Sequence, residues 1–196
     1  MSKRKSYISA AIVGALFATS AIVGPALAQD KMKGEKTVMV GGAAMFPSKN
    51  IVQNAVNSKD HTTLVAAVKA AGLVDTLSSA GPFTVFAPVN AAFAKLPAGT
   101  VETLLKPENK GTLTTVLTYH VVPGRLTASN LMKAVKDGGG QAKFKTVAGG
   151  EITVKQPSAG KLTITDAKGG TSTVTIGDVL QSNGVIHVID TVLLPS

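Results

Sequence analysis

The hydrophobic period of this chain changes about halfway along, and the change limits the chain to one class of fold. In segments 51–56 and 62–71, apolar residues recur every three to four positions, which is typical of helices that bury one face. Beyond residue 140, apolar and polar residues alternate instead, as they do in half-buried strands. The alternating segments are 144–147, 152–154, 162–164 and 174–176, with glycine- or proline-containing breaks between them. Helices that crowd the first half and strands that crowd the second predict an α+β domain.

Shorter elements are predicted between these two regions. Segment 83–87 is an apolar strand that Pro88 ends, and a helix follows at 91–96. Asn90 is a suitable N-cap for that helix. Segment 118–122 is predicted as a further strand, because a Pro-Gly pair stops it.

Residues 1–28 have the three parts of a secretory signal peptide. Basic residues at positions 3–5 precede an apolar stretch over 8–23, and an Ala-x-Ala pattern ends just before Gln29. The alternative is a retained membrane anchor, but the apolar stretch of about 16 residues is shorter than the roughly 20 that a spanning helix needs. We expect cleavage before Gln29, and a secreted or periplasmic mature chain that does not span the membrane.

The mature chain is predicted to consist of an arm and one domain. Residues 29–46 are polar and contain paired glycines, which favours a linker. Residues 47–196 contain the predicted helices and strands, including a long, deeply buried strand at 185–194. The chain has no cysteine, so disulfides and thiolate sites are excluded and core packing alone must stabilise the domain.

The charge of the chain favours anionic partners but not nucleic acid. Without the signal peptide, 17 Lys and Arg face 11 Asp and Glu, which gives +6. The lysines are scattered along the sequence, Arg125 is the single arginine outside the signal peptide, and there is no tryptophan. Nucleic-acid readers need clustered charge, arginine and stacking aromatics. We therefore expect weak electrostatic contacts with anionic polysaccharides, and no nucleic-acid binding.

Three short motifs occur in a recognisable order. Residues 84–93 read Thr-Val-Phe-Ala-Pro-Val-Asn-Ala-Ala-Phe, a Tyr-His pair follows at 119–120, and residues 183–190 read Asn-Gly-Val-Ile-His-Val-Ile-Asp. Together they resemble the fasciclin (FAS1) domain family, over roughly residues 47–195, and in particular a small secreted bacterial member with one domain. The motif residues expected to specify the fold are Phe86, Pro88, Asn90, Phe93, Asn183, Gly184, His187 and Asp190.

The resemblance implies a wedge-shaped β-sandwich with helices packed at one edge. It also implies a non-enzymatic module, without a cofactor, that mediates adhesion or matrix contacts with extracellular or envelope proteins. The alternative is a carrier of a small hydrophobic ligand such as a pigment or lipid, because some relatives bind carotenoids. We expect a monomer.

The candidate partner-binding residues are those that the resemblance links to partner contact in animal relatives: Tyr119, His120, Asp178 and Val179. For His120, a structural role is favoured over partner contact, and catalysis is disfavoured because no nucleophile motif accompanies it. His187, inside an apolar strand, is also predicted to be structural, and His61, at a helix start, to be exposed. The three histidines lack metal-site spacing, so no metal site is expected.

Overall fold

A seven-stranded sheet that bends along its length organises the domain. The computed structural model describes residues 36–195, so the predicted signal peptide and its cleavage before Gln29 lie outside the described residues. The strand order is β4-β3-β9-β8-β7-β6-β5, and β3 and β9 are the parallel pair in it. The strands of this sheet are β3 (Phe83–Pro88), β4 (Val121–Pro123), β5 (Gln141–Lys145), β6 (Glu151–Ser158), β7 (Lys161–Thr165), β8 (Thr171–Gln181) and β9 (Gly184–Ile189).

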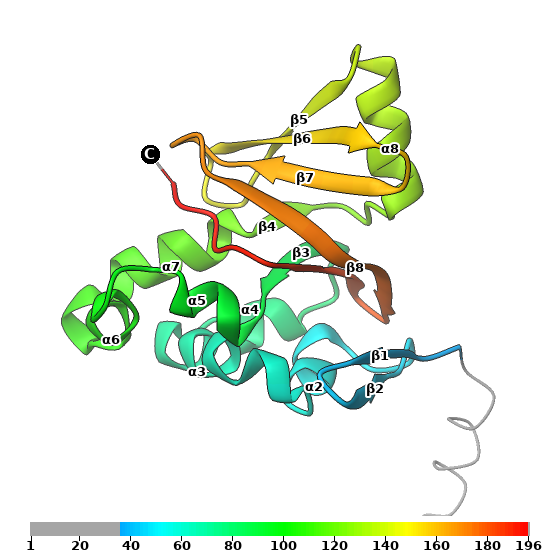
Figure 1. Ribbon diagram of the computed structural model, residues 1–196. Coiled ribbons are helices and arrows are strands. Elements are labelled where there is room, and N and C mark those ends of the chain that lie inside the picture. The colour runs from blue at the N-terminus through cyan, green and yellow to red at the C-terminus, as the bar shows by residue number, and fades with distance from the viewer. Residues whose placement is uncertain (1–35, 196) are drawn as a thin grey trace, which may run out of the picture. The chain divides into compact units, whose positions relative to one another are not determined.

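The helices precede most of these strands in the chain (Figure 1). A separate two-stranded hairpin, β1 (Val38–Val40) and β2 (Ala43–Met45), comes before them. The helices are α2 (Ile51–Ala55), α3 (Thr62–Ala71), α4 (Val74–Ser78), α5 (Asn90–Ala94), α6 (Thr100–Leu105), α7 (Lys110–Tyr119) and α8 (Ala128–Asp137), with 3-10 turns at Lys59–His61 and Pro107–Asn109.

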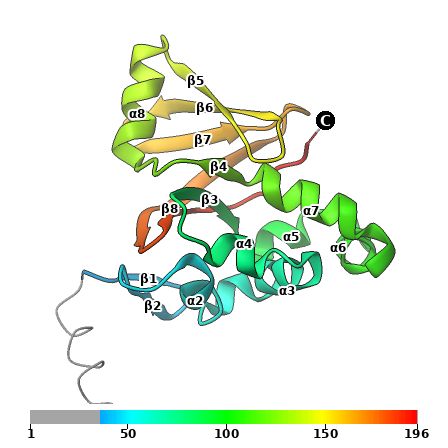
Figure 2. The ribbon, with the colours of Figure 1, turned by 180° about the vertical axis from the view of Figure 1, so that it is seen from behind.

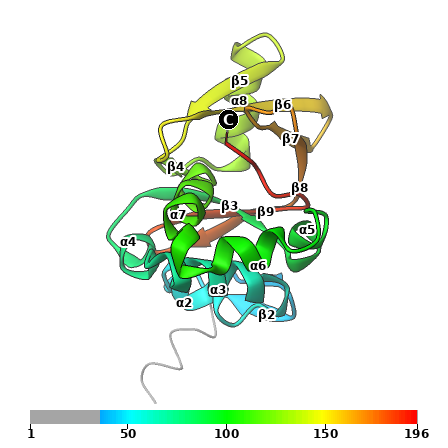
Figure 3. The ribbon, with the colours of Figure 1, turned by 90° about the vertical axis from the view of Figure 1, so that its left-hand side faces the viewer.

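Strand β8 divides the domain into two halves with separate cores. Its first residues pair with β7 and its later ones with β9, and the register of the β8–β9 pairing shifts twice between Val174 and Val179. Such bulges bend a strand. Figure 3 shows the result: β5–β7 lie above the β3–β9 pair, and α3 and α6 lie below it. We call these parts the strand half and the helical half.

The two faces of β3 and β9 contribute to different cores. Val85 and Ile186 pack into the helical half, whereas Phe86 and Ile189 pack into the strand half beneath β6, β7 and α8. Figure 2 shows α8 lying along β5–β7. The edge strands of the sheet also approach each other, because the Val147 N–H donates to the Val121 carbonyl at 2.8 Å. The expected α+β class with a sandwich-like strand region is confirmed.

The segment predicted as a linker instead contributes to the helical half. The side chains of Val40 and Met45, on either strand of the β1–β2 hairpin, are buried in that core. Gly41 and Gly42 have φ of 57° and 75°, as a two-residue hairpin turn requires. A Gly-Gly pair between two short apolar segments is typical of a β-hairpin. The prediction of an arm over 29–46 did not take this pattern into account.

Three element boundaries also differ from expectation. The segment predicted as a strand from residue 118 continues helix α7 to Tyr119, and β4 begins only at Val121. Helix α5 has Val89 as its N-cap, so Asn90 is its first helical residue. The Asn90 side chain instead accepts from the Thr63 N–H at 3.0 Å, which ties α5 to the start of α3. The predicted last strand of 185–194 ends at Ile189.

Gly41 allows the hairpin turn to approach the chain beyond α2. A Cβ added there would lie 2.7 Å from the Asp60 nitrogen and would also meet the Ser58 hydroxyl. Gly42 has a similar φ, but a Cβ there would meet nothing within 4 Å. We expect Gly41→Ala to lower the free energy of unfolding by about 2–4 kcal/mol, from strain plus overlap, and Gly42→Ala by only about 1–2 kcal/mol from strain. Urea unfolding of both variants measures the difference; equal losses would contradict a close approach at Gly41.

Candidate functional site

Tyr119 is fully buried between the two halves. Its hydroxyl donates to the Glu151 carbonyl at 2.6 Å and accepts from the Ala167 N–H at 3.0 Å. Burial raises the pKa of Tyr119, an effect that the Ala167 N–H opposes and the charge of Asp166 reinforces, so the group stays a protonated donor. The side chain therefore joins the end of α7 to the start of β6 and to the turn after β7.

His120 is also buried, and both its ring nitrogens have partners. Nε2 accepts from the Leu193 N–H at 2.9 Å, so the ring proton lies on Nδ1 and is donated to the Val116 carbonyl at 2.8 Å. Burial lowers the pKa of His120 to about 4, although the Val116 carbonyl and the Asp166 charge oppose the shift. Neutral His120 thus fixes the chain beyond β9 to the end of α7.

His187 and Asp178 together position the start of α8. His187 stacks on Phe86 with ring centroids 5.6 Å apart, and its Nε2 lies 2.8 Å from the Leu126 carbonyl. Burial lowers the pKa of His187, opposed by the Leu126 carbonyl and the charge of Asp178. Asp178 has a φ of 55°, and its carboxylate accepts from the Ala128 N–H at 2.6 Å.

Of the four candidate partner-binding residues, Asp178 alone has an exposed side chain. Tyr119, His120 and Val179 are 0%, 3% and 1% exposed. A partner cannot touch those three side chains in this structure, and the structure does not bring Asp178 together with Tyr119. His61 was predicted to be exposed; that prediction is wrong, because the side chain is 3% exposed. The 3-10 turn before α3 directs it inward.

The other motif residues connect elements of the fold. The Asn183 side chain donates to the Leu77 carbonyl at 2.8 Å and accepts from the Ile51 N–H at 3.0 Å. Gly184 lies against the Phe83 carbonyl, where a Cβ would overlap. The Asp190 carboxylate accepts from the Thr173 N–H at 2.8 Å. Burial alone would raise the pKa of Asp190. The bonds from the Thr173 N–H and the Thr191 hydroxyl, together with the Lys95 charge, outweigh burial, so the pKa is lowered. Pro88 ends β3, and Phe93 is half-buried against the cluster of Ala92, Val116 and Val192.

An exposed basic surface lies on the outer side of β5–β8, and the sequence analysis did not identify it. Residues that pair directly across antiparallel strands point to the same side of a sheet. Two such rows run across the strands, Lys143–Thr153–Thr165–Thr171 and Lys155–Thr163–Thr173. We call this surface the lysine–threonine face; it consists of Gln141, Lys143, Lys145, Glu151, Thr153, Lys155, Lys161, Thr163, Thr165, Thr171 and Thr173, and Glu151 is its one carboxylate.

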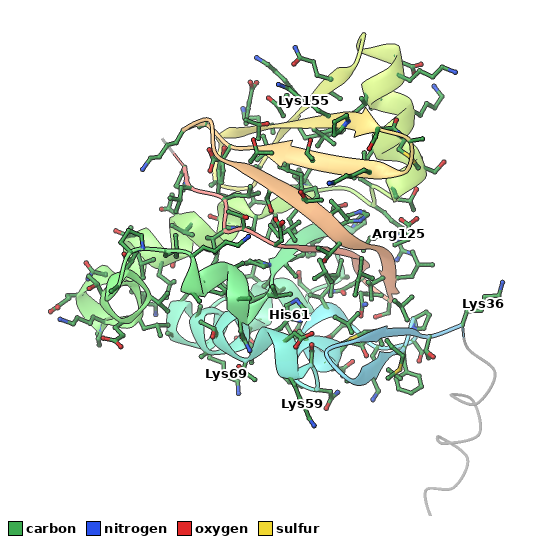
Figure 4. All side chains as sticks on the ribbon, in the orientation of Figure 1. Lys36, Lys59, His61, Lys69, Arg125 and Lys155 are labelled. Atoms are coloured by element: carbon green, nitrogen blue, oxygen red, sulfur yellow. The ribbon has the colours of Figure 1, made fainter. Side chains whose placement is uncertain are left out.

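The lysine–threonine face is largely free of compensating charge. Lys143 pairs with Glu151 at 3.7 Å, whereas Lys145, Lys155 and Lys161 have no carboxylate within salt-bridge distance among the described residues. Figure 4 shows Lys155 on the strand half, far from Lys59 and Lys69 at the opposite end of the domain. An open depression of about 500 Å³ adjoins the face near Lys145 and Gly150. The surface can therefore bind anionic groups and offer hydroxyls to a polymer.

The described residues assemble no group of three or more His, Cys, Asp or Glu side chains that could hold a metal ion. Within residues 36–195, no helix is long and apolar enough to cross a membrane.

Comparison with known proteins identifies one family. The profile of the Fasciclin domain matches residues 59–195. Protein sll1483 of Synechocystis is 47% identical over 174 residues, which cover 87% of this chain and 88% of that protein. Cell surface glycolipoprotein MPB83 of Mycobacterium bovis is 35% identical over 161 residues, covering 80% of this chain and 64% of that protein.

A solved structure has the same fold. The FAS1 domain pair of the insect cell adhesion molecule Fasciclin I superimposes with a TM-score of 0.67 at 21% identity. The match covers 76% of this chain and 52% of the insect chain, so this chain spans about half of that domain pair.

Proposed function

Because the chain belongs to the fasciclin domain family, we propose that it is a non-enzymatic contact module outside the cytoplasm, which binds anionic polysaccharide of the cell envelope or matrix through the lysine–threonine face. The names of its relatives support a role at surfaces: one is a cell surface glycolipoprotein and one a cell adhesion molecule. The predicted signal peptide supports a secreted or periplasmic location.

The single observation that carries the proposal is the lysine–threonine face itself. Strands lie about 4.8 Å apart and alternate residues about 7 Å apart along a strand, so the threonine hydroxyls form a regular array. The uncompensated lysines surround this array. Because their charges are exposed, salt screens their attraction to a polymer over about 8 Å at physiological ionic strength. Binding should be broad, weak and sensitive to salt.

The alternative function, a carrier of a pigment or lipid, receives less support. The enclosed apolar cavity of the helical half has a volume of about 50 Å³. That is about a third of the roughly 150 Å³ of an engineered cavity that takes up benzene, so a pigment or lipid chain does not fit.

The histidines also favour a non-catalytic role, since those in the motifs bind backbone groups rather than each other.

A charge-matched pair of triple variants tests the proposal. Lys145→Gln/Lys155→Gln/Lys161→Gln removes three charges from the lysine–threonine face, and Lys59→Gln/Lys69→Gln/Lys110→Gln removes three from the helical half. On immobilised alginate, we expect the face variant to elute at a clearly lower sodium chloride concentration than the wild type, because fewer counterions are released on binding. The helical-half variant should elute close to the wild type. If both variants eluted earlier by the same amount, retention would depend on net charge alone, and binding through the lysine–threonine face would be contradicted.

A further inference from the structure

The open depression beside the lysine–threonine face lies where strands β6 and β7 separate. Thr153 pairs with Thr165 across these strands. Continued by two residues, the same antiparallel register places Glu151 opposite Ala167. The Tyr119 hydroxyl stands between these two backbones, since it accepts from the Ala167 N–H and donates to the Glu151 carbonyl. An inserted hydroxyl holds two strands further apart than a direct N–H···O bond does, so a buried side chain fixes this separation.

Two hairpin turns border the depression. The β5–β6 turn at 146–150 and the β7–β8 turn at 166–170 lie at the same edge of the strand half (Figure 1). Gly149 and Gly150 line the depression without side chains, and a Cβ at Gly150 would lie 2.7 Å from the Tyr119 ring. The volume of about 500 Å³ is within the roughly 300–1,000 Å³ of small-molecule sites. The depression therefore has room for one sugar ring.

The depression presents one unpaired cation and one exposed acceptor. Lys145 has no carboxylate within salt-bridge distance among the described residues. Asp166 also lines the depression, but it is 9% exposed and its carboxylate accepts from three backbone N–H groups. Glu151 is exposed, and its contact with Lys143 at 3.7 Å is longer than a hydrogen bond. The Glu151 carboxylate therefore keeps lone pairs that can accept from a ligand.

Lys145 and Glu151 pair directly across β5 and β6. Side chains in such a pair have Cβ atoms about 5 Å apart and point to the same side of the sheet. A ligand that contacts both must present an anion and a hydroxyl donor close together. A uronic acid carries a carboxylate and hydroxyls on one ring, and its single charge matches the single unpaired lysine. A neutral sugar lacks the anion, and Glu151 would repel a dianionic phosphate ester more strongly.

We propose that the depression binds a single uronic acid unit of an envelope or matrix polysaccharide, with its carboxylate on Lys145 and a ring hydroxyl donating to Glu151. This inference rests on the proposed function, since the lysine–threonine face supplies the surface along which the rest of the polymer lies. Thr153 lines the depression and offers a further hydroxyl. The depression thus gives a face that attracts any polyanion a preference for carboxylated sugars.

Methyl β-D-glucuronoside and methyl β-D-glucoside form a matched pair of probes, because they differ only in the carboxylate that replaces a CH₂OH group. The measurement is a titration of the Gly150 and Ala167 amide shifts in the ¹⁵N-labelled full chain. We expect the glucuronoside to shift both amides saturably, with a dissociation constant of about 1 mM for its roughly 14 heavy atoms. The glucoside should bind at least tenfold more weakly, because it lacks the charge-assisted bond to Lys145. Equal affinity for the two would contradict the proposal.

Glu151→Ala separates a built site from general electrostatic attraction. The substitution removes a negative charge and releases Lys143, so an attraction based on charge alone would become stronger. If Glu151 accepts a ring hydroxyl, the glucuronoside should instead bind at least threefold more weakly. The bond from Tyr119 uses the backbone carbonyl and is kept. Glu108→Ala is the matched control, because it removes an exposed glutamate beside Lys106 and should leave binding unchanged. Tighter binding by Glu151→Ala would overturn the proposal.

Two lysine variants show whether the depression and the face act separately. Lys145 lines the depression and Lys161 does not, although both belong to the lysine–threonine face. Lys145→Gln should weaken glucuronoside binding at least fivefold and Lys161→Gln should leave it unchanged, whereas both should elute from alginate at lower salt. Equal weakening of glucuronoside binding would overturn the depression as a site and leave the face intact. Unchanged elution of both from alginate, with the glucuronoside effect confined to Lys145→Gln, would contradict the face alone.

Discussion

Acidification from pH 7 to pH 4 should remove several kcal/mol of stability from this domain, and the loss should begin near pH 6.5, above the range in which carboxylates titrate. The three histidines are buried, and burial lowers the pKa of each below the ordinary 6.5. For His120 the shift to about 4 corresponds to roughly 3 kcal/mol. His61 and His187 add to it in the same direction.

The sign follows from proton binding. Between pH 6.5 and about 4, unfolded His120 binds a proton and folded His120 does not. Unfolding therefore takes up protons, and the free energy of unfolding falls as the pH falls through this window. Within this window His120 contributes a slope of up to about 1.4 kcal/mol per pH unit. The lowered pKa of Asp190 acts in the same direction, but only below the usual carboxylate range.

Urea unfolding at half-unit steps between pH 7.5 and 4.5 measures this slope. His120→Gln should be less stable at pH 7 by about 1–3 kcal/mol, because Leu193 N–H and Val116 C=O lose a matched partner. It should also lose one histidine's share of the pH slope, which a merely structural defect would not change. A stability that is flat from pH 7 to pH 5 would contradict the buried neutral state of these rings.

Much of the fold could be predicted from periodicity and turn chemistry. The strands β5–β8 follow the alternation of apolar and polar residues, and α3 ends at Gly72, which has the left-handed conformation expected of a helix stop. The structural interpretation of His120 and His187 also agrees with their hydrogen bonds to backbone groups. Local patterns are informative here because each element buries one regular face.

The remaining features depend on contacts between distant segments. Nothing local to His61 indicates burial; the hairpin and β3 cover it. Residues 118–119 have strand-like composition, but helix α7 continues because Leu117 and Tyr119 pack into different cores on either side of it. The lysine–threonine face is formed by cross-strand register, which the sequence alone leaves open. The scattered lysines therefore gave no sign of a shared surface.

Tyr119 connects the two halves through both its ring and its hydroxyl. Its ring packs in the strand half against Gly150, where a Cβ would lie 2.7 Å from Cε2. Its hydroxyl binds Glu151, the first residue of β6, and Ala167, in the turn after β7. Because Tyr119 is the last residue of α7, it couples a helix of the helical half to the sheet of the strand half.

Tyr119→Ala should therefore lower the free energy of unfolding by about 3–5 kcal/mol, the range for losing a buried aromatic side chain. Tyr119→Phe keeps the ring and removes only the hydroxyl, so it should cost about 1–3 kcal/mol from the unpaired Glu151 carbonyl and Ala167 N–H. The two values separate packing from hydrogen bonding at one position.

Hydrogen exchange of the Phe variant locates the effect. The Ala167 amide, which loses its acceptor, should exchange faster, together with the adjacent turn at 166–170. Amides of α3, in the helical half, should keep the protection that the overall stability allows. If Tyr119→Phe were as destabilising as Tyr119→Ala, the ring would contribute nothing beyond its hydroxyl. If it left the turn amides unchanged, Tyr119 would not be the connection between the two halves.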